Sequence, residues 1–451
     1  YCTMNVLAQL EPQSVFGFFE QMCAIPHGSG NTKAISDWCA AFARERNLEY
    51  HQDADNNIII IKDATPGYEQ AEPIILQGHL DMVCEKEPGC TKDMDKEGLD
   101  LEVDGDLIRA KGTTLGGDDG IAVAMALAVL DADAIAHPRV EAVFTIDEEI
   151  GLLGADSLDV SPLKGRKMIN MDSEAEGIFT VSCAGGNTTT CILPLRRAAF
   201  SGCALRVTVG GLTGGHSGAE IDKGRANANM LMGRVLQAIA ERTELRILAV
   251  SGGLKNNAIP VESVASIVVA DEAAARDVVA EMAEAFKPEY HLTDPNLFVR
   301  AQAETAAQNP MDAETTGKVI CMLTCLPNGI QAMSADIPGL VQTSLNLGIL
   351  TTTEEELCAV FSLRSSIDSQ KEMLKRRMIC LMTQLGGRVE FGGEYTGWQY
   401  QEHSPLRELM AQVFEEQYGK APKIEAIHAG LECGLFAGKM PVWTVFPSAP
   451  I

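Results

Sequence analysis

Short apolar runs rich in β-branched residues recur through the first part of the chain. They span residues 58–61, 73–76, 140–146 and 168–171, and Gly, Asp or Asn residues punctuate them. Runs of this length and composition are typical of buried strands. An Ala-rich segment with a helical pattern, residues 121–131, lies between them. This alternation predicts an α/β domain with a central, mostly parallel sheet.

The predicted strands and helices become longer after about residue 186. The first pattern of shorter elements returns near residue 394. A chain of 451 residues exceeds the size at which one hydrophobic core stops growing, so two domains are expected. We predict a first domain built from residues 1–186 and 394–451. An α+β domain, residues 187–393, is inserted into it.

Composition and charge exclude several classes of partner. The formal net charge of -26 argues against nucleic acid and anionic membranes, and no apolar stretch is long enough to cross a bilayer. The amino terminus lacks the pattern of a secretory signal. The 13 cysteines include no Cys-x-x-Cys pair, which favours reduced thiols. We therefore expect a cytoplasmic protein that binds neither nucleic acid nor membrane.

A histidine and an aspartate follow the apolar run at residues 73–76. In Gly78-His79-Leu80-Asp81 the imidazole and the carboxylate stand two residues apart, and so on one face of an extended chain. A metal-bound histidine usually donates its second ring N–H to a carboxylate. His79 is therefore a candidate ligand with Asp81 as its orienting partner, although histidines at strand ends are often structural.

Acidic residues stand at three comparable places. Asp118 precedes the Ala-rich helix and is either an N-cap or a carboxylate that bridges two cations. Glu148 and Glu149 follow the third strand, where they form either a solvated turn or a ligand beside a general base. Asp172 ends the fourth strand.

The ends of successive strands meet at one edge of an open α/β sheet, and ligands gather there. These side chains are therefore expected to converge, although they are far apart in the sequence. Mixed imidazole and carboxylate ligation suits Zn²⁺, with Mn²⁺ or Co²⁺ as substitutes.

Six motifs together resemble those of the aminoacylase and carboxypeptidase-like two-zinc metallopeptidases, and within them the aminoacyl-histidine dipeptidases, also called Xaa-His or cytosol non-specific dipeptidases. They lie at residues 78–83, 117–120, 147–151, 170–174, 214–218 and 428–434. The likeness spans nearly the whole chain. It implies a two-zinc exopeptidase-type catalytic domain with an inserted lid domain, and a hydrolase that cleaves dipeptides with a water activated by two metal ions. It is compatible with a homodimer.

The resemblance assigns the metal ligands position by position. It implies that His79 and Asp172 bind one zinc ion, that Glu149 binds the second, and that Asp118 bridges both. It also implies a cis peptide bond between Asp118 and Asp119.

The remaining roles are carried over in the same way. Asp81 is implied to orient His79, and Glu148 to be the general base that takes a proton from the attacking water and passes it to the leaving amine. Three positions of the inserted domain match substrate-binding residues. His216 is implied to stabilise the oxyanion, and Asn257 and Arg364 to hold the carboxyl end of the substrate.

The last segment of the chain departs from the family pattern. The resemblance implies a final zinc ligand, a histidine in an Ile-His-Thr-Pro-like segment, but no histidine follows His428. We interpret residues 394–451 as an apparently truncated second part of the catalytic domain. Two alternatives stay open: a related amidohydrolase that acts on N-acyl amino acids, and an inactive binding protein with an incomplete metal site.

Overall fold

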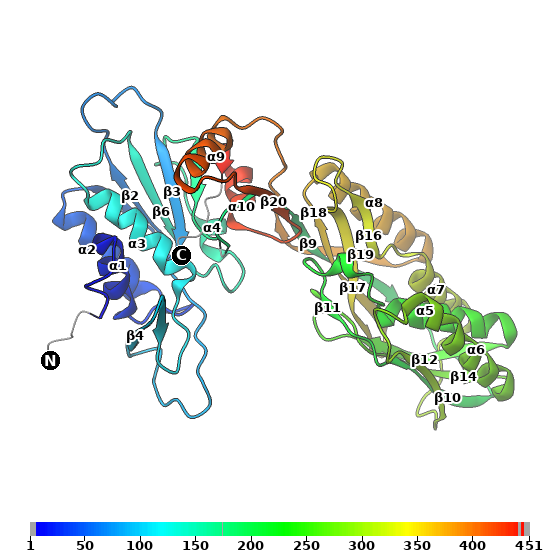
Figure 1. The fold of residues 1–451 in the computed structure, drawn as a ribbon. Helices are drawn as coiled ribbons and strands as arrows, with labels where there is room; N and C mark the ends of the chain where they lie inside the picture. The colour runs from blue at the N-terminus through cyan, green and yellow to red at the C-terminus, as the bar shows by residue number, and fades with distance from the viewer. Residues whose placement is uncertain (1–5, 174, 441–442, 446–451) are drawn as a thin grey trace. The chain divides into compact units, whose positions relative to one another are not determined.

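The computed structural model describes residues 6–173, 175–440 and 443–445 and divides the chain into two compact units (Figure 1). Unit 1 is built from residues within 1–182, 400–426 and 431–451, and unit 2 from residues 183–399 and 427–430. The predicted α/β fold with an α+β insertion is confirmed. Among the described residues, no helix combines the length and the apolar character needed to cross a membrane.

Unit 1 contains a six-stranded sheet in the order β1-β2-β6-β3-β7-β21. Its strands are β1 (Glu49–Gln52), β2 (Ile58–Lys62), β3 (Ile74–His79), β6 (Val140–Thr145), β7 (Lys167–Asn170) and β21 (Trp443–Val445). The strands from β6 to β21 run parallel, whereas β1 and β2 are antiparallel to their neighbours. Strand β6 is buried along its whole length, as its apolar sequence predicts.

Three helices share the main hydrophobic core of unit 1: α1 (Gln13–Cys23), α2 (Lys33–Glu45) and α3 (Gly117–Asp131). The Ala-rich helix α3 packs against α1 and β3, because a helix that is apolar on most sides must be buried. Helix α1 ends at Cys23, two residues before Ile25, which is disfavoured in a helical conformation because Pro26 follows it.

Shorter elements complete unit 1. They are β4 (Leu101–Asp104), β5 (Leu107–Ala110), α4 (Leu153–Ser157), β8 (Ile178–Cys183), α9 (Pro405–Tyr418), β20 (Lys423–Ile427) and α10 (Glu432–Lys439). Strands β4 and β5 form an antiparallel pair, and β8 pairs with β20. The pairing of β8 with β20 connects the first and last parts of the unit.

Unit 2 contains a nine-stranded sheet in the order β15-β10-β14-β12-β17-β18-β9-β19, with β16 paired to β17. The strands are β9 (Gly185–Pro194), β10 (Cys203–Gly210), β12 (Leu245–Gly252), β14 (Ser263–Val269), β15 (Phe298–Ala303), β16 (Gly329–Met333), β17 (Val341–Thr352), β18 (Glu356–Ser365) and β19 (Arg388–Tyr395). All pairs in this sheet are antiparallel.

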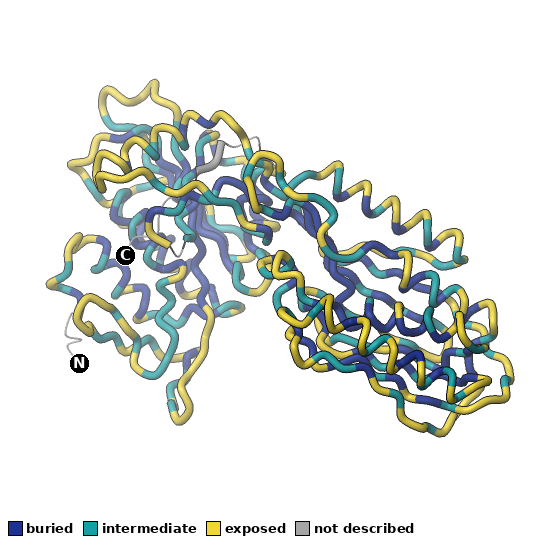
Figure 2. The backbone as a smooth tube through the Cα atoms, turned by 45° about the vertical axis from the view of Figure 1, so that its right-hand side comes forward, coloured by how far each residue is buried: buried dark blue, intermediate teal, exposed yellow. Residues whose placement is uncertain are grey.

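The helices of unit 2 are α5 (Ala228–Arg242), α6 (Glu272–Tyr290), α7 (Ala313–Cys325) and α8 (Asp368–Leu385). They pack with the sheet around one hydrophobic cluster. Residues are buried along most of the central strands and exposed on the outer turns of the helices (Figure 2).

The limits of the units differ slightly from the predicted domain boundaries. Residues 183–186 and 394–399 lie with the inserted unit, as does the segment 427–430. Backbone hydrogen bonds explain this placement, because Cys183 exchanges two with Trp398 and Ala184 N donates to Ala429 O.

Candidate metal centre

The candidate site of unit 1 lies at the carboxyl ends of three parallel strands. His79 is the last residue of β3 and pairs in register with Thr145, the last residue of β6. Gln77 of β3 pairs with Asn170, the last residue of β7. The loops that follow β6 and β7 therefore begin at one edge of the sheet. Glu148, Glu149 and Asp172 stand on these loops.

Helix α3 delivers a further carboxylate to the same edge. Asp118 and Asp119 have non-helical backbone angles within its first turn, and the peptide bond between them is cis, as the resemblance implies. Asp118 Oδ1 lies 3.0 Å from His79 Nε2. Asp119 Oδ2 accepts a hydrogen bond from His79 N at 3.2 Å. A Cβ at position 78 would lie 2.6 Å from Asp119 Oδ2, so any residue larger than glycine there would displace the Asp119 side chain.

Two groups of side chains bring potential ligand atoms within 4.8 Å of one another. One group is His79, Asp118 and Asp172, and the other is His79, Glu148 and Glu149. Among the described residues, no such group holds both Asp118 and Glu149, which the resemblance assigns to one metal ion. One imidazole and four carboxylates form a donor set that fits divalent cations such as zinc.

Asp81 contacts both the end of β3 and the loop that follows β6. Its side chain is fully buried, and Oδ1 lies 3.3 Å from His79 Nδ1. The same oxygen accepts a hydrogen bond from Glu148 N at 3.0 Å, while Oδ2 accepts from Ser29 Oγ at 2.7 Å and from Glu149 N at 3.4 Å. His79 Nδ1 also lies 3.0 Å from the Asp81 carbonyl oxygen, so this nitrogen carries a proton and Nε2 is left for a ligand bond.

Crowding of the acids shifts their pKa values strongly. Burial, together with the charge of Asp172, raises the pKa of Glu148 to about 8. Burial likewise raises the pKa of Asp172 to about 7 and holds the pKa of Asp119 well above its ordinary range. Burial alone would lower the pKa of His79, but its hydrogen bonds to Asp118 and Asp81 outweigh burial and raise it. A bound cation would compensate this negative charge, so the electrostatics also fit a metal ion.

We expect the metal-free protein to lose stability as the pH rises from 5 to 8.5. The pKa values of Glu148 and Asp172 rise from 4.5 and 3.8 to about 8 and about 7 on folding, so their stabilising contributions are complete below the lower values and lost as pH passes the higher ones. The raised pKa of His79 acts in the same direction. Cations bind the deprotonated groups, so the gap between metal-loaded and metal-free melting temperatures should widen over this interval. Thermal unfolding with zinc or a chelator at several pH values measures this gap, and a constant gap would contradict the expectation.

The substrate-binding positions implied by the resemblance lie in unit 2. His216 belongs to the short strand β11 (Gly215–His216), which pairs with β13 (Ala258–Ile259). Arg364 of β18 is 7% exposed, and its Nη1 donates to Tyr395 Oη at 3.0 Å. A Cβ at Gly218 would lie 3.0 Å from both Arg364 Nε and His216 Cε1, so these two side chains are brought together. Asn257 is exposed and precedes β13.

The tautomer of His216 follows from its contacts. Its Nδ1 accepts hydrogen bonds from Gly218 N at 3.1 Å and from Ala219 N at 3.0 Å. Burial, aided by the charge of Arg364, lowers the pKa of His216, so the ring is neutral at pH 7. A neutral ring whose Nδ1 accepts carries its proton on Nε2. His216 therefore has an N–H donor directed by its own loop.

Two buried residues of the motif at 428–434 were not among the predicted site residues. His428 Nε2 lies 2.7 Å from Ser344 Oγ in unit 2, and burial lowers its pKa to about 4. Glu432 is 1% exposed in unit 1 and accepts a hydrogen bond from Gln77. The motif itself was the only sequence signal for either residue.

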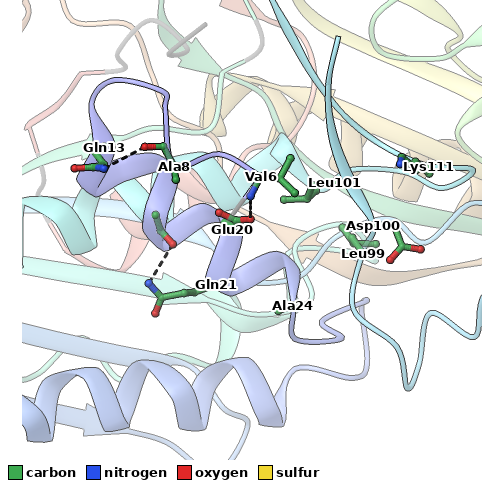
Figure 3. A pocket seen from close by; sticks show the side chains of 11 residues that line it. Val6, Ala8, Gln13, Glu20, Gln21, Ala24, Leu99, Asp100, Leu101 and Lys111 are labelled. Carbon is green, nitrogen blue, oxygen red and sulfur yellow. Dashed lines mark hydrogen bonds between the residues drawn. The ribbon is translucent and has the colours of Figure 1, made fainter. Parts of the chain in front are cut away.

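A separate pocket of unit 1, with a volume of about 960 Å³, lies beside α1 and residues 99–101 (Figure 3). Its lining includes Glu20, Gln21 and Lys111 and none of the predicted site residues. Glu20 is hydrogen-bonded there to the backbone, because Val6 N donates to its Oε1 at 2.6 Å. This pocket is distinct from the candidate metal centre.

Known proteins resemble this chain over nearly its whole length. The cytosol non-specific dipeptidase of Escherichia coli (strain K12) is 37% identical over 442 residues, which cover 97% of this chain and 91% of the relative. The crystal structure of aminoacylhistidine dipeptidase from Vibrio alginolyticus superposes with a TM-score of 0.91 at 34% identity, covering 99% of this chain and 92% of that one.

More distant similarity supports the fold and one segment. Aminopeptidase PepT from Bacillus cereus superposes with a TM-score of 0.53 at 15% identity, covering 97% of this chain and 90% of that one. Residues 207–294 match the family model of the M20 peptidase dimerisation domain. This segment begins within β10 and ends just beyond α6 in unit 2.

Proposed function

Because the chain belongs to the family of cytosol non-specific dipeptidases, we propose that it is a metal-dependent hydrolase of dipeptides, including those with a carboxy-terminal histidine. The observation that carries this proposal is the convergence of His79, Asp118, Glu148, Glu149 and Asp172 at one edge of the parallel sheet.

Zinc is the metal that we propose, two ions per chain, with Mn²⁺ or Co²⁺ as substitutes. His79 and Asp172 would hold one ion, Glu149 the second, and Asp118 both; Asp81 would hold a ring proton of His79 on Nδ1, so that Nε2 is the nitrogen that binds an ion. Bound divalent ions supply Lewis acidity, which polarises a peptide carbonyl and lowers the pKa of water.

Glu148 is the proposed general base. Glu148 would be ionised once bound cations compensate the crowding that raises its pKa, and it could then accept a proton from the attacking water. The same carboxyl group would then give the proton to the leaving amine. The hydrogen bond from Glu148 N to Asp81 fixes its backbone beside His79.

Residues of unit 2 are proposed to bind the substrate. His216 would donate its Nε2–H to the oxygen on which negative charge develops during attack. Arg364 and Asn257 would hold the carboxylate at the end of the dipeptide, since a guanidinium matches a carboxylate in shape and charge.

A panel of substrates tests the proposal. The zinc-loaded protein is incubated with free dipeptides, among them Xaa-His peptides, and with N-acetyl amino acids, and the released amino acids are quantified. We expect release from the free dipeptides. Release only from the acylated substrates would favour an amidohydrolase, and a protein that neither binds zinc nor cleaves any substrate would favour a binding protein.

We further propose that the chain forms a homodimer and acts in the cytoplasm. The match to a peptidase dimerisation domain supports self-association, which light scattering during gel filtration measures as twice the mass of one chain. Two observations support the cytoplasm: the bacterial relative is named a cytosol dipeptidase, and the described cysteines form no disulfide bond.

A further inference from the structure

A buried carboxylate, Glu432, contacts the strand that carries His79. It is the first residue of α10 and is 1% exposed. Its Oε2 accepts a hydrogen bond from Gln77 Nε2 at 2.7 Å. Its Oε1 is buried and accepts no hydrogen bond from any described residue. Burying a carboxylate in this way costs folding free energy, and none of the roles above accounts for it.

Glu432 begins a chain of hydrogen bonds that ends at Asp172. Gln77 Oε1 accepts from Asn170 Nδ2, and Asn170 Oδ1 accepts from Asp172 N at 3.1 Å. Gln77 and Asn170 are paired in register across β3 and β7 and are 0% and 3% exposed. These hydrogen bonds therefore connect α10 to the loop that carries Asp172.

The direction of every bond in this chain is set at Asp172, because a backbone N–H can only donate. Asn170 must therefore direct its carbonyl oxygen toward Asp172 N and its NH₂ group toward Gln77. Gln77 in turn directs its NH₂ group toward Glu432, which has to supply the acceptor at the end of the hydrogen-bond chain. Each side-chain amide has one orientation that satisfies both of its neighbours.

We propose that Glu432 is a positioning residue that fixes the backbone of Asp172 through Gln77 and Asn170 and so raises the affinity of the site for a divalent cation. The inference rests on the proposed function, because it takes Asp172 as a ligand. Partners that orient metal ligands typically contribute 10- to 100-fold to metal affinity.

The affinity of the full-length, metal-free protein for Zn²⁺, measured by competition with a chromophoric chelator, tests this role. Glu432→Met keeps the approximate size of the side chain but offers Gln77 no acceptor oxygen, so the hydrogen-bond chain no longer reaches α10. We expect about 10- to 100-fold weaker binding. An unchanged zinc affinity overturns the proposal.

A matched control separates positioning from general stability. Glu141 of β6 is also fully buried, but it accepts hydrogen bonds from Arg139, Lys164 and Gly165 at the start of the strand. We expect Glu141→Met to lower the melting temperature of the metal-free protein and to leave zinc affinity unchanged. Glu432→Met should show the reverse pattern, because it removes a buried carboxyl group that has an unpaired oxygen. Equal zinc affinity in the two variants overturns the proposal.

A second variant tests the same hydrogen-bond chain without altering Glu432. Gln77→Met should weaken zinc binding to a similar extent, and adding it to Glu432→Met should cause little further loss, since both break one connected chain. Wild-type zinc affinity in Gln77→Met overturns the proposal even if the Glu432 variant fails to fold. A wild-type protein that binds zinc but cleaves no dipeptide would refute the proposed function and leave this inference standing.

Discussion

Glu148→Gln is expected to lower kcat/KM for dipeptides by roughly 10²- to 10⁴-fold, the usual contribution of a positioned general base. Gln has the shape of a protonated glutamate, and the pKa of about 8 means that metal-free Glu148 is already mostly protonated at pH 7. Folding should therefore be little affected. Steady-state kinetics combined with metal analysis measures both quantities, and we expect the metal content to stay near that of the wild type.

The adjacent acid provides the control for this prediction. Asp147 Oδ1 accepts a hydrogen bond from Gly30 N at 2.7 Å, and its φ of 53° is one that asparagine also tolerates. Asp147→Asn removes a charge one residue away and keeps this contact, so near-normal turnover is expected. A Glu148→Gln variant with normal turnover would contradict the role of base. Loss of metal from that variant would show instead that Glu148 is a ligand, which its distance from His79 and Glu149 allows.

The sequence predicts the strand ends of unit 1 well because burial on both faces leaves a clear pattern. The runs at residues 58–61, 140–146 and 168–171 correspond to β2, β6 and β7 within one residue at each end. Strand β3 extends three residues beyond the predicted run, as far as His79, because Gln77 and Gly78 continue the pairing with β6. The polar Gln77 interrupts the apolar pattern, so hydrophobicity alone does not predict that the strand continues.

Pairing order and long-range contacts are less accessible to sequence reasoning. Nothing in the local pattern of β1 and β2 shows that they pair antiparallel beside β6, because the register depends on the whole sheet. The contact between Gln77 and Glu432 joins residues separated by 355 positions. Similarly, the hydrogen-bond partner of Arg364 is Tyr395, from a different strand. Such partners become visible only when the chain is folded.

The proposed role of Asp118 as a ligand shared by two ions leads to the largest expected change in metal content. A carboxylate held by two cations belongs to both sites, so Asp118→Ala should remove a ligand from each at once. We expect zinc affinity to fall by more than the roughly 100-fold that loss of a mere orienting partner can cause, and turnover to fall with it. Metal analysis after dialysis against buffer without zinc, together with kcat/KM, measures both effects.

The other end of the same helix supplies the control for Asp118→Ala. Asp131 is the last residue of α3 and forms an ion pair with Arg46 at 2.6 Å near the surface. Asp131→Ala removes an equal charge from the helix, and only a small loss of stability is expected because such pairs contribute little. Full metal content in Asp118→Ala would mean that the ions are held without a shared ligand. Loss of a single ion would place Asp118 at one metal alone, and since Asp118 lies with His79 and Asp172, that metal would be the one these two residues bind.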